Sequence, residues 1–446
     1  MARAGRDGER RDLRISIRDL GPISEGVIDL RPLTILTGPN NSGKSYAAAL
    51  VHSIVSAENG TLPAPDPSRL GHLPLLQRVY GRFGEIPRAG GALRAPVPGR
   101  LAGRIRAYVL RELFPAALLG HIAASLGPAG GLARRGAGPA RVAVRGGFSA
   151  SLAGKVSVRR ASPRDGAGGP DLESLVRGII KESRIPGTPP ASARFPAARS
   201  ALLESWMRGA DVTGSMGPCR PVAHSPRLAG TIADHDGALL LPDERGPLYG
   251  LGSGIESDLL SGSIDLKTNA GARREILYRS RGTTVPLQAA SAAASEIAPV
   301  TLYLKHVAVP GSLLVIEEPE SHLHVGGQVV MARCIVRMVR AGLRVLLTTH
   351  SSPIIDEIST YMQSSRASPA ARRRSGLRPG DYLEFDEVAP YEFKKSGRGH
   401  AIRGIRADDE GIPHADYVGE LERIYDRACR LGDEMDAERG GTAQGG

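Results

Sequence analysis

Aromatic residues are scarce in this chain of 446 residues, where Phe, Trp and Tyr together make up 4% of the sequence. A hydrophobic core must therefore consist mainly of Leu, Val, Ile and Ala. The three cysteines, Cys219, Cys334 and Cys429, are far apart and form no CxxC pair. This pattern excludes a disulfide framework and a paired-cysteine metal site, and it is typical of a reducing compartment.

Long hydrophobic runs are absent as well. No apolar stretch approaches the roughly 20 residues that cross a bilayer. Residues 1–14 are charged and lack the apolar segment of a secretory signal. We therefore expect a cytoplasmic protein with no membrane partner. The composition, 41% hydrophobic and 23% charged, is that of a globular chain and excludes wholesale disorder.

Lysine is rare among the basic residues, since 7 of the 58 are Lys and 51 are Arg. The positive charge is concentrated, because residues 51–200 contain 22 Lys and Arg against 8 Asp and Glu, while the whole chain has a net charge of +12. A basic segment of this kind is compatible with an anionic polymer such as DNA. The alternative is a GC-rich coding sequence, which enriches Arg, Ala, Gly and Pro whatever the function.

Hydrophobic periodicity predicts an α/β fold, beginning with a block of three strands and a helix. The predicted strands cover Leu13–Ile17, Val27–Leu30 and Leu33–Leu36, and the predicted helix covers Tyr46–Val55. The third strand enters a glycine-rich turn that leads directly into the helix. A mononucleotide-binding loop has this arrangement.

A second block lies between residues 275 and 360. Its strand–helix–strand order requires parallel strands joined by a crossover. We expect Pro299 to interrupt its first helix early, and Gly342 to stand at the end of its second helix. The predicted elements are a strand at Thr283–Leu287, a helix at Ser291–His306, strands at Leu313–Ile316 and Leu343–Thr349 with a helix at Gln328–Arg340 between them, an exposed loop at Arg366–Pro379, then a short strand pair and a helix at Tyr417–Glu434.

The strongest motif follows the third strand and matches GxxxxGK[ST], the phosphate-binding P-loop. Backbone N–H groups of such a loop and of the following helix surround phosphates. Lys44 is expected to reach the β- and γ-phosphates of ATP, and the Ser45 hydroxyl to bind Mg²⁺. The predicted nucleotide-binding residues are Gly38, Pro39, Asn40, Asn41, Ser42, Gly43, Lys44 and Ser45.

Two carboxylates, Glu317 and Glu318, follow the buried strand Leu313–Ile316. Burying carboxylates at the end of a strand costs free energy unless a cation or hydrogen-bond donors lie close to them. We expect Glu317 to hold Mg²⁺, through water, and Glu318 to polarise the attacking water. His350 follows the next strand and is expected within reach of the γ-phosphate. The predicted catalytic residues are therefore Glu318 and His350.

Ser291 begins the small-residue run Ala290–Glu296, at the start of a predicted helix. A serine at a helix N-terminus can donate to phosphate oxygens. The alternative interpretation is that Ser291 is an ordinary helix N-cap.

The order of these motifs resembles the ABC-type ATPase heads of the SMC/RecF/OLD group, in particular the AAA-15 and AAA-21 types. The resemblance rests on GPNNSGKS, the small-residue serine motif, the run Glu317–His324 with the pattern EEPExHLH, and the TTHS that contains His350. It implies a mixed sheet, a homodimer formed around ATP, Ser291 as the signature serine acting across that dimer, and His350 as the switch histidine. The run Ala197-Ala198-Arg199 resembles an LPAaR segment of the same group.

The chain departs from the group's pattern at several positions. Ala292 and Ala293 replace the signature glycines, Glu317 replaces an Asp, and Val325 replaces the proline after HLH. No glutamine is assigned to a Q-loop, and Gln77 is a candidate for that role. Residues 408–410, Asp-Asp-Glu, follow no buried strand, so we expect no Toprim nuclease domain of the OLD type.

The predicted organisation is one head interrupted by a long insertion between the P-loop and the signature motif. Residues 1–60 and 236–434 form its two halves, 61–235 are an Arg/Gly/Pro-rich insertion, and 435–446 are a disordered tail. The resemblance implies a Mg²⁺-dependent ATPase in DNA repair or anti-phage defence, with DNA or another nucleic acid, or a separately encoded effector protein, as partner. An ATP-gated scaffold that does not hydrolyse is the alternative. The long insertion argues against a transporter subunit.

Overall fold

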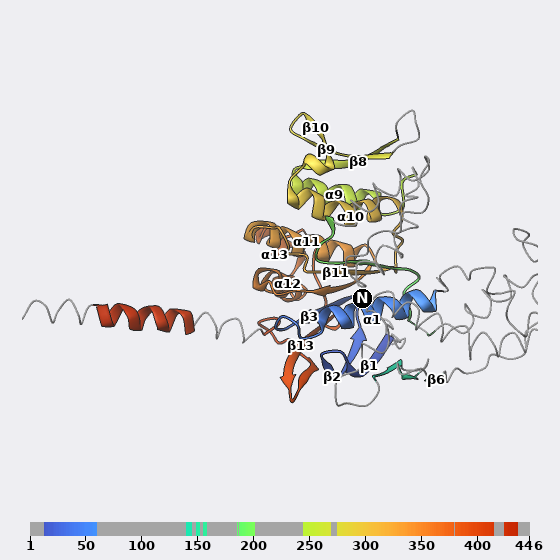
Figure 1. Ribbon diagram of the computed structural model, residues 1–446. Coiled ribbons are helices and arrows are strands. Elements are labelled where there is room, and N and C mark those ends of the chain that lie inside the picture. Colours follow the sequence, from blue (N-terminus) through green and yellow to red (C-terminus); the bar gives the residue numbers. More distant parts are fainter. Residues whose placement is uncertain are drawn as a thin grey trace, which may run out of the picture.

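The computed structural model describes residues 13–59, 140–144, 149–151, 155–157, 185, 187–200, 244–268, 274–378, 380–413 and 423–435. A large mixed β-sheet organises this part of the chain (Figure 1). Its eleven strands lie in the order β6-β5-β4-β1-β2-β14-β13-β3-β12-β11-β7. They are β1 (Leu13–Leu20), β2 (Ile23–Leu30), β3 (Leu33–Thr37), β4 (Arg141–Val144), β5 (Ser149–Ser151), β6 (Lys155–Ser157), β7 (Ser192–Phe195), β11 (Leu313–Glu317), β12 (Arg344–Thr348), β13 (Val388–Ser396) and β14 (Gly399–Gly404).

Parallel pairing at the centre of the sheet brings the predicted motifs to one edge. β12 lies between β3 and β11, and it pairs in parallel with both. β11 also pairs in parallel with β7, and β3 with β13. Because the strands run the same way, the segments that follow β3, β11 and β12 all leave the sheet at its carboxyl edge. The α/β class, the mixed sheet and the parallel crossover are thereby confirmed.

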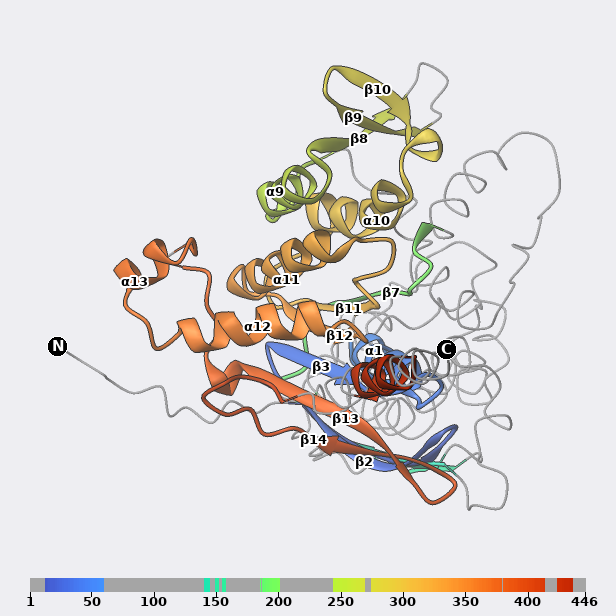
Figure 2. The ribbon, with the colours of Figure 1, turned by 90° about the vertical axis from the view of Figure 1, so that its left-hand side faces the viewer.

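Helices cover both faces of the sheet, and alternate strand residues point to the two cores. α1 (Lys44–Glu58) packs on one face against Leu313 and Val315 of β11. On the other face, Leu314 and Ile316 pack with the remaining larger helices (Figure 2). Those helices are α9 (Tyr249–Leu260), α10 (Ala292–His306), α11 (Val325–Arg340) and α12 (Ser352–Ser364).

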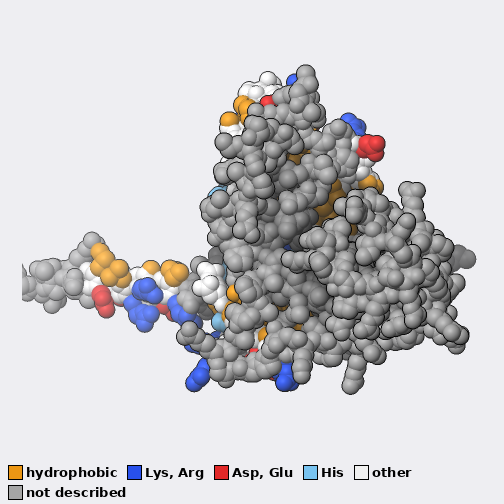
Figure 3. Space-filling model, turned by 45° about the vertical axis from the view of Figure 1, so that its right-hand side comes forward, with side chains coloured by type: hydrophobic (Ala, Val, Ile, Leu, Met, Phe, Trp, Pro, Cys, Tyr) orange, Lys and Arg blue, Asp and Glu red, His pale blue; other side chains and the backbone are white. Residues whose placement is uncertain are grey.

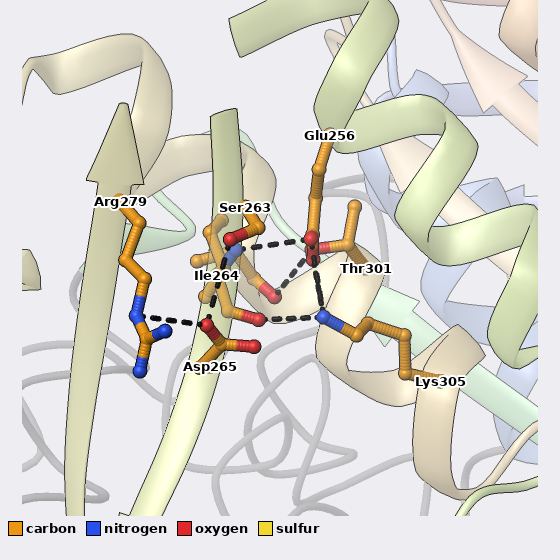
Figure 4. Close-up of polar contacts among 8 residues, drawn as sticks. Glu256, Ser263, Ile264, Asp265, Arg279, Thr301 and Lys305 are labelled. Atoms are coloured by element: carbon orange, nitrogen blue, oxygen red, sulfur yellow. Dashed lines mark hydrogen bonds and ion pairs between the residues drawn. The ribbon is translucent and has the colours of Figure 1, made fainter. Parts of the chain in front are cut away.

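A buried ion pair joins α9 and α10 to a small antiparallel sheet of β8 (Gly262–Thr268), β9 (Arg274–Ser280) and β10 (Thr283–Pro286). Lys305 on α10 lies 3.1 Å from a carboxylate oxygen of Glu256 on α9. Both groups also bond the backbone of Ile264 on β8 (Figure 4). Burial raises the pKa of Glu256, and losing Lys305 would leave its charge uncompensated. The pair therefore fixes the helix that begins next to Ser291.

Two local predictions were wrong. Pro299 does not interrupt α10, which continues to His306. The flanking Ala298 and Val300 are buried in the core, so tertiary packing outweighs the lost hydrogen bond. Residues 366–379 are not simply an exposed loop, since they contain α13 (Pro369–Arg374). Its Arg372 is buried, with its guanidinium 4.4 Å from the centre of the Tyr382 ring.

The large sheet extends into the segment that we predicted as an insertion. β4, β5 and β6 extend one end of it, and β7 forms the other end. Gln77 lies outside the described residues, as do 105–119 and 172–181, where the sequence pattern is helix-like. Residues 423–435 form a helix that Figure 1 draws apart from the sheet. Its apolar side chains Ile424, Tyr425 and Leu431 are exposed beside basic ones (Figure 3).

None of the helices in the described ranges is long and apolar enough to cross a membrane.

Candidate functional site

The P-loop connects β3 to α1 through three residues with positive φ. Gly38 and Gly43 have φ of 131° and 106°, and Asn41 has φ of 60°. A Cβ at Gly43 would lie 2.7 Å from the Ile23 side chain, and one at Gly38 would lie 3.0 Å from the carbonyl oxygen of Phe393. Both glycines are therefore required by backbone conformation and by space. The loop tip, Pro39 to Asn41, is exposed.

Lys44 is a buried cation without an anionic hydrogen-bond partner in the described structure. Its ammonium donates to the carbonyl oxygens of Gly38 and Pro39, each at 2.8 Å. Desolvation lowers the pKa of Lys44 to about 8, although the nearby charges of Glu318 and Glu320 oppose this shift. An anion placed in the loop would stabilise the charged form.

The beginning of α1 is open to an anion. Gly43 stands at its N-cap, so no side chain caps the first turn. The Ser42 hydroxyl is buried and has no hydrogen-bond partner among the described residues. Ser45 is partly buried in the first turn of α1. Uncapped N–H groups, a spare hydroxyl and a buried ammonium together fit a polyphosphate.

The end of β11 makes a strained turn at Glu318, whose φ is 47°. A non-glycine residue in this region persists only where its surroundings hold it. The N–H of Glu318 donates to the carbonyl oxygen of Thr348 on β12 at 2.8 Å. The turn separates the two carboxylates, because Glu317 is buried beside β7 while Glu318 is close enough to Lys44 and His350 to act on their pKa values.

Glu317 is held by Arg194, which the sequence did not lead us to expect. Nε and Nη2 of Arg194 both lie 2.7 Å from Oε1 of Glu317, and both side chains are buried. The pairing follows from register, since Arg194 pairs with Val315 and Glu317 lies two residues further along the same face. A magnesium ion at Glu317 would share this carboxylate with Arg194.

Glu320 connects the turn after β11 to the segment after β12. Its Oε1 accepts from the Thr349 hydroxyl at 2.9 Å and from the N–H of His350 at 2.7 Å. Burial raises the pKa of Glu320. Its Oε2 is buried and has no hydrogen-bond partner among the described residues. Glu320 therefore holds the backbone that carries His350.

The imidazole of His350 is exposed at this edge of the sheet. Desolvation and the charge of Lys44 lower the pKa of His350, against the opposite effect of Glu318. The imidazole is therefore neutral at pH 7 and can exchange hydrogen bonds without carrying charge.

Ser291 is placed differently. It is the exposed N-cap of α10, and its hydroxyl accepts from the N–H of Ala294 at 3.3 Å. This is the geometry of the N-cap alternative. The structure thus brings Lys44, Glu318 and His350 together, while the hydrogen bonds described for Ser291 are to its own helix.

These residues fit Mg²⁺-ATP by their chemistry. Mg²⁺ on a nucleotide usually has few protein ligands, because phosphates and water supply the others. Ser45 and Glu317 are the oxygen ligands predicted for it. Within the described ranges no group of three or more His, Cys, Asp or Glu forms a separate metal site.

Arg194, Arg199, Glu296 and Glu320 are the site residues that our sequence reasoning did not assign. Arg199 was noticed through its motif but given no role. The local signal for the partner of Glu317 is that β7, a strand of four residues, contains an arginine, Arg194. The contact itself depends on strand order, which no local pattern reveals.

Residues 180–357 match the AAA_21 family model, described as "AAA domain, putative AbiEii toxin, Type IV TA system". This match includes Glu317, Glu318, Ser291 and His350, but it begins after the P-loop. The P-loop is supported independently by its backbone geometry. The match confirms the predicted likeness to AAA-21-type ATPases. No curated protein matches the chain.

Solved structures of SMC heads are similar to this chain at low identity. A head bound to the C-terminal winged-helix domain of ScpA is 12% identical with a TM-score of 0.43, covering 88% of this chain and 97% of that one. The Thermotoga maritima SMC head is 11% identical, with a TM-score of 0.37 and coverages of 89% and 99%. A Pyrococcus furiosus head with an extended coiled coil, bound to the C-terminal domain of ScpA, is 12% identical, with a TM-score of 0.41 and coverages of 92% and 98%.

Proposed function

We propose that the chain is a P-loop AAA ATPase of the ABC/SMC-like type, and that it binds and slowly hydrolyses Mg²⁺-ATP. The observation that supports this best is Lys44, a buried ammonium that bonds two loop carbonyls at 2.8 Å beneath an uncapped helix N-terminus. Neutral carbonyls do not balance its charge, and phosphate oxygens would.

In this proposal, Lys44 and the first turn of α1 hold the phosphates, and Ser45 and Glu317 hold Mg²⁺. The metal would neutralise part of the phosphate charge. Glu318 takes a proton from the attacking water, with its backbone fixed by Thr348. His350, held through its N–H by Glu320, contacts the γ-phosphate as a neutral imidazole.

We propose further that two heads associate around ATP. Ser291 caps its own helix and is exposed, and in this proposal it contacts the nucleotide bound at the P-loop of the second copy. The biological setting that the family likeness supports is DNA repair or anti-phage defence, with a separately encoded effector. The basic segment 51–200 supports DNA as the partner polymer.

The test is ATP turnover by the purified chain, followed as phosphate release, with Lys44→Ala and Glu318→Gln as variants. We expect slow release by the parent, none by either variant, and retained ATP binding by Glu318→Gln alone. Parent protein that binds ATP without releasing phosphate would instead support the ATP-gated scaffold. The bond between Glu317 and Arg194 favours that second function, since it competes with the metal for the carboxylate.

A further inference from the structure

Arg199 lies between the two parts of the molecule that carry the proposed catalytic residues. Its side chain is 1% exposed. On one side, Nη1 donates to the carbonyl oxygen of Glu317 at 2.8 Å and lies 3.5 Å from that of Glu318. On the other side, Nε donates to the carbonyl oxygen of Glu296 at 3.0 Å. One guanidinium therefore contacts both the end of β11 and the first turns of α10.

The side chain of Glu296 makes further contacts with residues 199 and 200. Its Oε2 accepts from the backbone N–H of Arg199 at 2.8 Å and lies 3.4 Å from Nε of the same residue. Its Oε1 accepts from the Ser200 hydroxyl at 2.7 Å. Glu296 is 3% exposed and lies five residues after Ser291, the N-cap of α10. Movement of this end of α10 would therefore move Arg199.

The opposite side of Arg199 meets the strained backbone at Glu318. The positive φ of Glu318 requires support from its surroundings. Thr348 supplies an acceptor for the N–H of Glu318, and Arg199 supplies a donor for the carbonyls before and after it. Nη2 of Arg199 is buried and has no hydrogen-bond partner among the described residues, so its two N–H groups could donate if the turn or α10 moved.

We propose that Arg199 is a positioning residue that couples the start of α10 to the Glu318 turn. When α10 shifts, Glu296 moves the guanidinium, and the guanidinium changes the support of the turn that presents Glu318. An effect of this coupling on catalysis rests on the proposed function, in which Glu318 is the general base. The mechanical coupling itself is independent of nucleotide.

A double-mutant cycle followed by hydrogen exchange tests the coupling in nucleotide-free protein. The variants are Glu296→Gln, Arg199→Met and the double variant, and the readout is exchange of the backbone amides of Glu318, Glu320 and Ser321. Glu296 bonds residues 199 and 200, so an effect of Glu296→Gln on that turn must pass through them. We expect Glu296→Gln to speed exchange there at least about threefold, and to add nothing in the Arg199→Met background. Equal effects in both backgrounds, or no effect at the turn, would overturn the proposal.

The matched control is Arg372→Met, which removes another buried arginine, bonded to the Ser364 carbonyl oxygen on α12. It should leave exchange of the same three amides unchanged, and a comparable increase there would mean a general loss of stability. If Arg199→Met does not fold, Arg199→Lys replaces it in the cycle. A single ammonium cannot reproduce the two-sided contact, so the effect of Glu296→Gln should shrink without vanishing.

Turnover separates this inference from the proposed function. We expect Arg199→Met to lower kcat with little change in KM for ATP, because the P-loop is intact, and Arg199→Lys to restore part of kcat. A parent without ATPase activity would refute the proposed function, while the exchange cycle would still decide the coupling. An active parent with additive exchange effects would refute the coupling alone.

Discussion

Two nitrogens of Arg194 lie 2.7 Å from one and the same oxygen of Glu317, in a place where both side chains are almost completely buried. The residue predicted to hold the metal is thus already paired with a cation from the neighbouring strand. A buried pair of this kind contributes little net stability, but removing one partner leaves the other charge uncompensated.

Glu317→Gln should therefore destabilise the fold as well as weaken Mg²⁺-ATP binding. We expect the free energy of unfolding in urea to fall by about 3–5 kcal/mol. The double variant Arg194→Met with Glu317→Met should recover most of this loss. Asp29→Asn is the matched control, because it breaks the 3.3 Å Arg14–Asp29 pair, whose side chains are 40% and 33% exposed. A loss from Asp29→Asn as large as that from Glu317→Gln would contradict the reasoning.

ATP binding should take up a proton near pH 8. The pKa of Lys44 is about 8 in the free protein, and phosphates would raise it by stabilising the ammonium. Affinity should therefore fall as pH rises above about 8. Calorimetry in buffers of different ionisation enthalpy measures this uptake, and Lys44→Ala should abolish binding altogether. Lys44→Ala protein that binds ATP like the parent would refute the P-loop assignment.

The same lysine should affect stability in a predictable direction. Its pKa is lower in the folded protein, about 8, than its ordinary value of 10.5. Between these values the unfolded chain binds more protons, so the free energy of unfolding rises with pH. Lys44→Met should remove this rise and stabilise the nucleotide-free protein at pH 7, as measured by urea unfolding. A pH dependence that survives the substitution would assign the rise to another group.

Glu318→Gln should accumulate as an ATP-stabilised dimer, because the amide keeps the shape of the side chain but cannot accept a proton. Light scattering at saturating Mg²⁺-ATP measures the mass. Adding Ser291→Ala should return the protein to monomer if Ser291 acts on the nucleotide of the partner. A Glu318→Gln protein that remains monomeric would count heavily against association around ATP.

His350 should titrate below its ordinary pKa of 6.5 in the free protein, and its pKa should rise when ATP binds. Because the folded pKa is the lower one, the unfolded chain binds more protons between the two values. Stability is therefore lost as pH falls through 6.5 toward the folded pKa. NMR titration of the parent, with His350→Gln to assign the signal, measures both shifts. A pKa at or above 6.5 without nucleotide would contradict the prediction.

The basic segment 51–200 should bind duplex DNA through phosphates without reading sequence. If about five phosphates are neutralised, log K should fall with log salt at a slope of roughly −4 to −5. Changing Arg104, Arg106, Arg134 and Arg135 to Glu should flatten the slope and leave basal ATP turnover intact. Equal slopes, or no binding at about 50 mM salt, would favour genome composition as the source of the arginines and a protein as the partner.

Local patterns in the sequence determined much of this protein. The alternating strands before the P-loop, the buried runs that became β11 and β12, and the helix ending before Gly342 all follow from side-chain periodicity and backbone preferences. The order of the motifs along the chain was enough to predict that the P-loop, the carboxylates and His350 meet at one edge, because parallel strands end together.

Only the tertiary structure decided which groups share a buried space. The partnership of Arg194 with Glu317 joins residues 123 positions apart, and that of Arg199 with Glu296 joins residues 97 apart. Both depend on β7 lying beside β11, a strand order that no local pattern encodes. Pro299 shows the same limit, since burial of its neighbours maintains a helix that local preference would end. Burial makes each of these charges depend on its partner, because removing one leaves the other uncompensated, and burial exists only once the chain has folded.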